Sequence, residues 1–282
     1  AVSVSSYALV ADADSRNLGK NMSLYWAGGS LGWATPLLFA GWLLNTYGIV
    51  SIFLISLTLS IAILILTLIT IPIDRGAEVR SSRKGIWSLK PVIKLLKNRI
   101  FLTLYSSSFM FMVGDVIKNI YIPQYHAYKI GLGESLATAI LSLASWFEIP
   151  AILLFGRILP IAGGATIYVA SLASMAAYLY FNSVVENLVT ASIAMASYSI
   201  VWATYITSIS VLVPLSVDVE NRGMALGLVN SNFALANIIS NVILSNVVNT
   251  YGYNQTFTVV AIAMLLSMLT VALSYRRRTL TH

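Results

Sequence analysis

Long apolar segments alternate with short polar turns along most of the chain. Eight of these segments reach about 20 residues, the length that a helix needs to cross the hydrocarbon core of a bilayer. The pattern therefore predicts an all-α integral membrane protein with eight complete membrane-spanning helices. The predicted spans cover residues 22–44, 50–72, 99–122, 135–158, 160–181, 187–212, 223–247 and 255–275.

The first ten residues, "AVSVSSYALV", are also apolar but are too short to span a bilayer. The chain begins with Ala1 rather than with methionine. We therefore expect residues 1–10 to be the end of a helix that begins further upstream, and the chain to be an N-terminally truncated fragment. A short segment lying in the membrane interface is the alternative.

Composition agrees with a membrane protein. Hydrophobic residues make up 58% of the chain, charged residues only 10%, and the mean hydropathy is +0.82. A soluble domain is nearer a quarter charged. The chain has no cysteine, and its two histidines, His126 and His282, lie far apart. We therefore expect no disulfide, no metal centre and no cofactor, and the absence of a Walker-type loop argues against ATP as the energy source.

The basic residues are distributed unevenly. If the spans alternate in direction, 15 of the 17 Lys and Arg residues lie on one side of the membrane, whereas Lys129 lies on the other side and Lys118 within a span. Cytoplasmic loops carry an excess of basic residues. This predicts a multi-pass plasma-membrane protein with a cytoplasmic C-terminus. The net charge of +7 is then explained by topology and contact with lipid, and nucleic acid is not expected as a partner. The 15 residues are Arg16, Lys20, Arg75, Arg80, Arg83, Lys84, Lys90, Lys94, Lys97, Arg99, Arg157, Arg222, Arg276, Arg277 and Arg278.

The sequence contains a repeat at an offset of 204 residues. The segment "DSRNLGKNMSLYWAGG…NTYGIVSIF" from Asp14 matches "DVENRGMALGLVNSNF…NTYGYNQTF" from Asp218. The identities include Gly19 with Gly223 and a four-residue stretch, Asn-Thr-Tyr-Gly, in both copies. Each copy has an acidic turn, a span, a short turn and a second span. Two parallel repeats divided by a long basic loop are an architecture of secondary transporters.

The turn Asp-x-x-x-x-Gly before a glycine-rich span resembles the turns before spans five and eleven of the major facilitator superfamily. The resemblance implies spans four to twelve of a twelve-helix fold. Residues 1–72 would be the remainder of the N-terminal half, 73–98 the cytoplasmic central loop and 99–282 the six-helix C-terminal half. It also implies a role in conformational change for the turn residues Asp14, Gly19, Asp218, Arg222 and Gly223. The segment "GRILPIAGGAT" departs from the family's corresponding loop, because it lacks the aspartate and the basic pair.

Two charged residues lie within the predicted span 99–122. Asp115 and Lys118 are three residues apart, a spacing that places them on one face of a helix. There they could neutralise each other, either as a structural pair or as part of a transport pathway. A Lys118 side chain that reaches outward to the interface is a further alternative.

A third charge, Glu148, lies in the span 135–158 on the same face as Ser142 and Ser145. The stretch "EIPAILLFGRI" resembles span eight of the sugar efflux branch of the superfamily. By that resemblance, Glu148 is the best candidate for binding substrate or a proton. A glutamate that is satisfied by the backbone or by a neighbouring helix is the alternative. Pro150 predicts a bend beside it.

Aromatic and amide stripes complete the predicted pathway. The aromatic stripe is Tyr198, Trp202 and Tyr205, and the amide stripe is Asn230, Asn237 and Asn241, with Trp33 facing the cavity from the first complete span. Aromatic rings can stack on a sugar or an aromatic compound, and amides suit neutral hydroxylated ligands. Simple packing is the more frequent explanation of such an aromatic stripe, and it explains the amide stripe equally well.

These observations predict a secondary active transporter that works by alternating access, most simply a monomer. We expect proton-coupled export of a sugar or similar polar compound, so that its partners are a small molecule, protons and the bilayer. Export of amphiphilic drugs is the alternative within transport, and a channel or receptor is the alternative outside it. An intramembrane enzyme is not expected, because no predicted span contains a histidine and the acidic residues are scattered.

Overall fold

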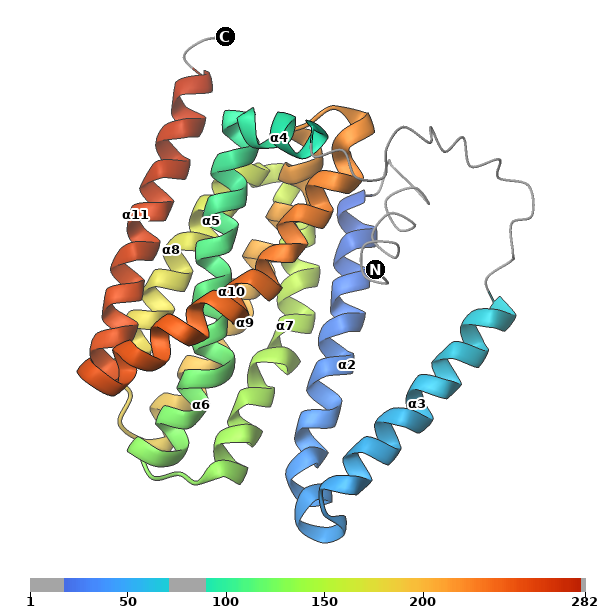
Figure 1. Ribbon diagram of the computed structural model, residues 1–282, viewed down its shortest axis with the longest axis vertical. Helices are drawn as coiled ribbons and strands as arrows, with labels where there is room; N and C mark the ends of the chain where they lie inside the picture. Colours follow the sequence, from blue (N-terminus) through green and yellow to red (C-terminus); the bar gives the residue numbers. More distant parts are fainter. Residues whose placement is uncertain (1–17, 71–89, 280–282) are drawn as a thin grey trace.

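The computed structural model describes residues 18–70 and 90–279, and every regular element in them is helical (Figure 1). The long helices are α2 (Leu18–Tyr47), α3 (Ile49–Thr70), α5 (Arg99–Val116), α7 (Glu134–Ala162), α8 (Gly164–Asn182), α9 (Leu188–Leu215), α10 (Arg222–Tyr251) and α11 (Tyr253–Thr279). The short elements are α4 (Lys90–Lys97), η2 (Ile117–Tyr121), α6 (Ile122–Gln124), η3 (Tyr125–Lys129) and η4 (Val219–Asn221).

Seven of the eight predicted spans match one long helix to within four residues at each end, and the span 99–122 is the exception. Within the described ranges, seven helices are long and apolar enough to cross a membrane, and α2, which is rich in Gly and Trp, is not among the seven. The all-α membrane fold is therefore confirmed. Residues 1–17 and 71–89, which include the predicted helix end and most of the predicted central loop, lie outside the described residues.

The predicted ends at residues 158 and 122 both lie too early. The span predicted to end at residue 158 continues through Pro160 to Ala162, and the turn comes at Gly163, whose φ of 81° suits glycine. The span predicted to end at 122 continues through η2, α6 and η3 to Lys129, so a spanning helix does contain His126. Both η2 and η3 are π-helical turns, and Pro123 between them has no N–H to donate.

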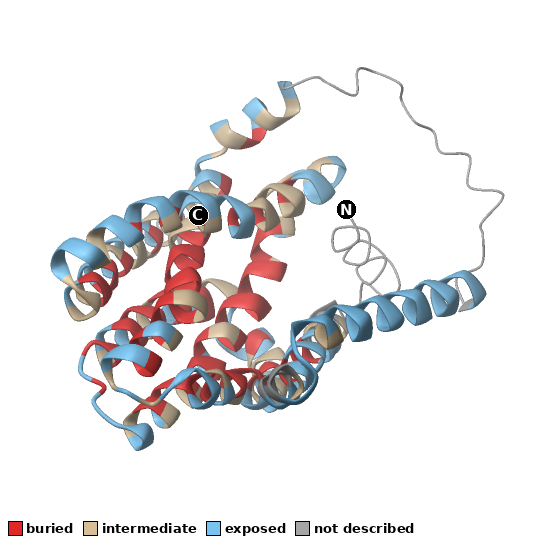
Figure 2. Ribbon diagram, turned by 60° about the horizontal axis from the view of Figure 1, so that its bottom comes forward, coloured by how far each residue is buried: buried red, intermediate tan, exposed pale blue. Residues whose placement is uncertain are grey.

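Six long helices form the main bundle. In it, α9 packs against α7 and α8, α11 against α8 and α5, and α10 against α5, while α2 packs along α7. Figure 2 shows buried residues concentrated inside this bundle. By contrast, α3 leans away from the bundle and contacts α2, and it exposes apolar side chains on all sides (Figures 1 and 2). Such a surface is suited to lipid.

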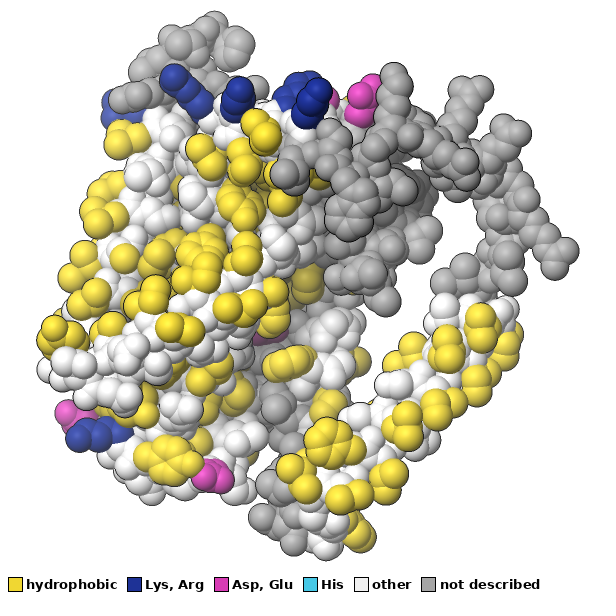
Figure 3. Space-filling view, in the orientation of Figure 1, with side chains coloured by type: hydrophobic (Ala, Val, Ile, Leu, Met, Phe, Trp, Pro, Cys, Tyr) yellow, Lys and Arg dark blue, Asp and Glu magenta, His cyan; other side chains and the backbone are white. Residues whose placement is uncertain are grey.

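Most of the Lys and Arg side chains visible in Figure 3 gather at one end of the bundle, the end at which α4 lies. The turn between α9 and α10 lies at the same end. Asn98 joins it to the start of α5, because its Oδ1 accepts the N–H groups of Ile100 and Phe101 and its Nδ2 donates to the Ser216 carbonyl at 2.9 Å. Lys94 forms an ion pair with Asp218 at 3.3 Å across this end. The assignment of this end to the cytoplasm stays a prediction.

Candidate functional site

Glu148 occupies the middle of α7, and its side chain is only 5% exposed. Its Oε2 accepts a hydrogen bond from Ser30 Oγ on α2 at 2.8 Å. Ala27, Ser30 and Ala34 are all buried, and their spacing places them on one face of α2. These small residues allow α2 to approach α7 closely. Ser30 was not predicted from the sequence, although the small-residue face of α2 was a signal that could have identified it.

Asp115 lies at the end of α5 and is also 5% exposed. Its Oδ1 accepts from the hydroxyl of Tyr198 on α9, and its Oδ2 accepts from Asn119 Nδ2 at 2.9 Å. Lys118 Nζ donates to Asn119 Oδ1 at 3.2 Å and lies 4.6 Å from the centroid of the Tyr198 ring. The phenol of Tyr198 and the amide of Asn119 therefore connect the Asp115 carboxylate to the Lys118 ammonium group.

Within the described ranges, Lys118 makes no direct ion pair with Asp115 or Glu148. The three-residue spacing placed Asp115 and Lys118 on one helix face, where they could neutralise each other. In the structure, Lys118 and Asn119 lie in the π turn that begins at Ile117, and the Asn119 side chain bridges Asp115 and Lys118 by hydrogen-bonding to both. Lys118 is 3% exposed, so it does not reach outward. Sequence reasoning missed Asn119, since its role depends on that turn.

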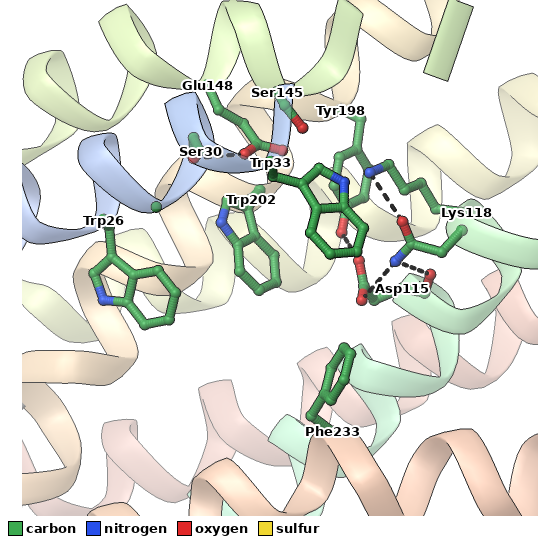
Figure 4. A pocket seen from close by; sticks show the side chains of 12 residues that line it. Trp26, Ser30, Trp33, Asp115, Lys118, Ser145, Glu148, Tyr198, Trp202 and Phe233 are labelled. Atoms are coloured by element: carbon green, nitrogen blue, oxygen red, sulfur yellow. Dashed lines mark hydrogen bonds between the residues drawn. The ribbon is translucent and has the colours of Figure 1, made fainter. Parts of the chain in front are cut away.

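These charged side chains line one cavity of about 210 Å³ between α2, α7, α9, α10 and the helix that α5 begins (Figure 4). Aromatic rings from three helices form much of its wall. The lining residues are Trp26, Gly29, Ser30, Trp33, Asp115, Lys118, Asn119, Ser145, Glu148, Tyr198, Trp202 and Phe233. The cavity brings together side chains from helices that are far apart in the sequence, at the middle of their lengths.

A second cavity, of about 290 Å³, adjoins the first and shares Trp26, Trp202 and Phe233 with it. No charged residue lines it. The remaining lining residues are Met112, Tyr205, Ile206, Ile209, Ser210, Leu226, Val229 and Asn230. The two cavities together therefore have a charged end and an apolar end.

Some predicted site residues lie elsewhere. Ser142 is buried and donates to the Ala139 carbonyl. The amides of Asn237 and Asn241 donate to carbonyls four residues earlier in α10, and neither residue lines a cavity described here. Only Asn230 of the amide stripe does so.

Tyr205 lines the second cavity through its ring. Its hydroxyl pairs with Ser108 Oγ at 2.7 Å, and its ring stacks on Phe111 with 3.8 Å between centroids. These contacts fix the ring as a rigid part of the wall.

The predicted conformational residues that the structure describes line neither cavity. Arg222 Nε donates to the Pro214 carbonyl at 3.1 Å, and Asp218 pairs with Lys94. Gly223 has open space where a Cβ would be. Gly19 belongs to the first turns of α2, and Asp14 lies outside the described residues.

A comparison with models of known protein families matches residues 1–240 of the chain to the Major Facilitator Superfamily. No curated protein sequence matches the chain. The family match covers α2 and α3, the charged cavity and most of α10.

Proposed function

Because the chain belongs to the Major Facilitator Superfamily, a family of secondary transporters, we propose that it exports a small solute by alternating access and that Glu148 couples this transport to proton movement. The observation that carries the proposal is the environment of Glu148. It is a buried carboxyl group in the middle of a spanning helix, and its hydrogen-bond partner is a neutral hydroxyl rather than a cation.

Such a carboxyl group responds to hydration. Burial disfavours the ionised form, whereas water favours it. A Glu148 side chain that alternates between a closed and a hydrated cavity would therefore take up a proton in one state and release it in the other.

The Ser30–Glu148 hydrogen bond links this proton to the movement of the helices. Ser30 belongs to the segment that we assign to the N-terminal half, and Glu148 belongs to the C-terminal half. Rocking of the halves would separate the two side chains. A hydrogen bond to an ionised acceptor contributes about 1.5–3 kcal/mol, against about 0.5–1.5 kcal/mol for a neutral pair. Protonation of Glu148 would therefore weaken the contact between the halves.

The cavity walls favour an amphiphilic solute over a sugar. Trp26, Trp33, Trp202 and Phe233 line the charged cavity, and the second cavity is largely apolar. Of the three asparagines that suggested a sugar, only Asn230 lines either cavity. A sugar, the class that the Glu-Ile-Pro motif indicates, is the alternative.

The test uses the full-length protein in proteoliposomes with an imposed pH gradient. Labelled lactose and labelled tetraphenylphosphonium serve as probes of the two solute classes. We expect Glu148→Gln to abolish gradient-driven accumulation while exchange without a gradient persists, because the amide keeps the shape but cannot release a proton. Glu134→Gln, at the exposed start of the same helix, is the matched control. Normal accumulation by Glu148→Gln would refute the coupling role.

A further inference from the structure

His126 is buried without a hydrogen-bond partner. It lies in η3 and is 0% exposed, and neither of its ring nitrogens bonds to a group in the described part of the chain. A neutral imidazole has one donor nitrogen and one acceptor nitrogen, so both remain unsatisfied in this conformation. A buried polar group without a partner destabilises the fold and calls for an explanation.

A second side chain at the same end of the bundle is only partly satisfied. Asn182, the last residue of α8, is 0% exposed, and its Nδ2 donates to the Tyr178 carbonyl at 2.8 Å. Its Oδ1 has no partner among the described residues. Both His126 and Asn182 lie at the end of the bundle opposite α4, which we call the outer end (Figure 1).

Three hydrogen bonds hold the outer end closed. The Tyr125 hydroxyl donates to the Val185 carbonyl at 2.8 Å, and Asn254 Nδ2 donates to the Ser183 carbonyl and to the Tyr125 hydroxyl. These bonds, which we call the outer clamp, join η3 to the turn between α8 and α9 and to the first turn of α11. All of them are between uncharged groups, and water can replace each partner when the elements separate.

The chain on either side of His126 is suited to a local movement. It lies in one of two π turns, which are separated only by Ile122–Gln124, and π turns within α-helices are frequent at functional sites. The loop that follows contains Gly131 and Gly133, whose φ values of 83° and 77° suit glycine. The Leu132 N–H donates to the His126 carbonyl at 3.1 Å, so this loop is connected directly to the histidine.

We propose that the outer clamp opens within the C-terminal helices, and that acid on that side of the membrane favours the open form by protonating His126. In the closed form an imidazolium would be a buried charge without a partner, which is strongly unfavourable. In the open form water satisfies both nitrogens and solvates the charge. The proton therefore binds to the open form and draws the equilibrium toward it.

The other ionisable groups at this end do not explain such a response. The charged ones are Lys129 on η3, Glu134 on α7 and Glu186 in the turn before α9; all three are exposed, and none pairs with His126. The remaining titratable groups are phenols, which ordinarily ionise near pH 10. These phenols are Tyr121, Tyr125 and Tyr128 on the same helix, Tyr178 and Tyr180 on α8 and Tyr253 on α11. Among the described groups of the outer end, the imidazole is thus the one suited to change charge between about pH 5 and pH 8.

The size of the effect follows from this one proton. An imidazole in water has a pKa of about 6.5. When only the open form binds the proton, the ratio of open to closed molecules rises about ten-fold between about pH 7.5 and about pH 5.5.

The experiment measures distances between pairs of spin labels by pulsed electron paramagnetic resonance, in the full-length protein in lipid nanodiscs. The outer pair is Ser135→Cys on α7 and Val184→Cys in the turn between α8 and α9, both at exposed positions. The control pair is Ile161→Cys and Leu215→Cys, at exposed positions near the ends of α7 and α9 beside α4. We expect the outer pair to show a second, longer distance whose population, relative to the shorter one, grows about ten-fold from about pH 7.5 to about pH 5.5. The control pair should keep one distance.

Variants in the labelled background test the residues. His126→Gln keeps a polar side chain that cannot become charged, so the outer pair should no longer respond to pH. His126→Phe removes the two unsatisfied nitrogens and should keep the clamp closed at both pH values. Tyr125→Phe removes one bond of the clamp and should increase the open population at pH 7.5. Glu134→Gln and Glu186→Gln are the controls and should respond to pH as the parent does.

An outer-pair distance that does not change with pH in the protein with native His126 would overturn the inference, because His126 would then be a structural side chain only. This result does not depend on the folding of any His126 variant. A response that survives in His126→Gln, or that disappears in Glu186→Gln, would assign the proton to another group and would also overturn it. The proposed transport function stands separately. Both labels lie on C-terminal helices, so rocking of the two halves leaves their distance unchanged, and Glu148→Gln should keep the response.

Discussion

Replacing Tyr198 by phenylalanine tests whether Asp115 is an ionised, hydrogen-bonded acceptor inside the bundle. The substitution removes one hydroxyl group and keeps the ring, whose faces contact Lys118 and Tyr178. The Tyr198 hydroxyl donates to Asp115 Oδ1, and Asp115 is 5% exposed. Without this donor the carboxylate keeps the bond from Asn119.

The expected cost follows from these contacts. A hydrogen bond to a charged group contributes about 1.5–3 kcal/mol, and a buried acceptor that loses its partner lies toward the upper end of that range. We therefore expect Tyr198→Phe to lower the free energy of unfolding by about 2–3 kcal/mol.

Tyr178→Phe is the matched control. Tyr178 is as deeply buried, and its ring lies 5.0 Å from that of Tyr198, but its hydroxyl contacts the sulfur of Met195 at 3.7 Å. Sulfur is a weak acceptor, so we expect this variant to lose about 1 kcal/mol or less.

The assay is equilibrium unfolding of both variants in mixed micelles, followed by circular dichroism. If Tyr178→Phe is destabilised as much as Tyr198→Phe, the cost comes from packing of the rings, and the interpretation of Asp115 as a charged acceptor is wrong. A second measurement adds Asp115→Asn. Because this change removes the charge, Tyr198→Phe should cost less in the Asp115→Asn background than in the wild type.

Two further predictions concern packing and topology. Gly114→Ala should lower the free energy of unfolding by about 1–3 kcal/mol, because the added Cβ would lie 2.9 Å from the sulfur of Met175. Gly223→Ala is the control and should not destabilise the protein, because its Cβ would meet open space. Equal unfolding free energies for the two variants would contradict this prediction. A thiol reagent that cannot cross the membrane should label Val184→Cys but not Val219→Cys in intact cells. These exposed positions lie at opposite ends of the bundle, and only the Val219 end carries the basic cluster. Labelling of Val219→Cys would show that the predicted orientation is reversed.

The helices of this fold could be predicted because their signal is local. A run of apolar residues that is long enough to cross a bilayer has few alternatives to a helix. The sequence did not predict the π turns at Ile117–Tyr121 and Tyr125–Lys129, since they depend on contacts with neighbouring helices as well as on Pro123. The inclusion of His126 in a spanning helix was missed for the same reason.

The site could be predicted only in part, for a related reason. Charges within apolar spans indicate a polar interior wherever they occur, which is why Glu148, Asp115 and Lys118 were identifiable one by one. Periodicity shows which residues share a face but not what that face meets. The amides of Asn237 and Asn241 share a face of α10, yet they bond to their own helix. The partners Ser30 and Asn119 required knowledge of tertiary contacts.

The π turn at Ile117–Tyr121 makes the number of residues in this segment as important as their identity. Each residue of an α-helix turns the chain by about 100°, so the loss of one residue here would rotate every later side chain relative to Asp115. If the lost residue lies between Asp115 and Lys118, Lys118 and Asn119 would leave the cavity while the sequence on either side stayed intact. Relatives that share the charged cavity should preserve the spacing from Asp115 to Pro123 even where the residues between them differ.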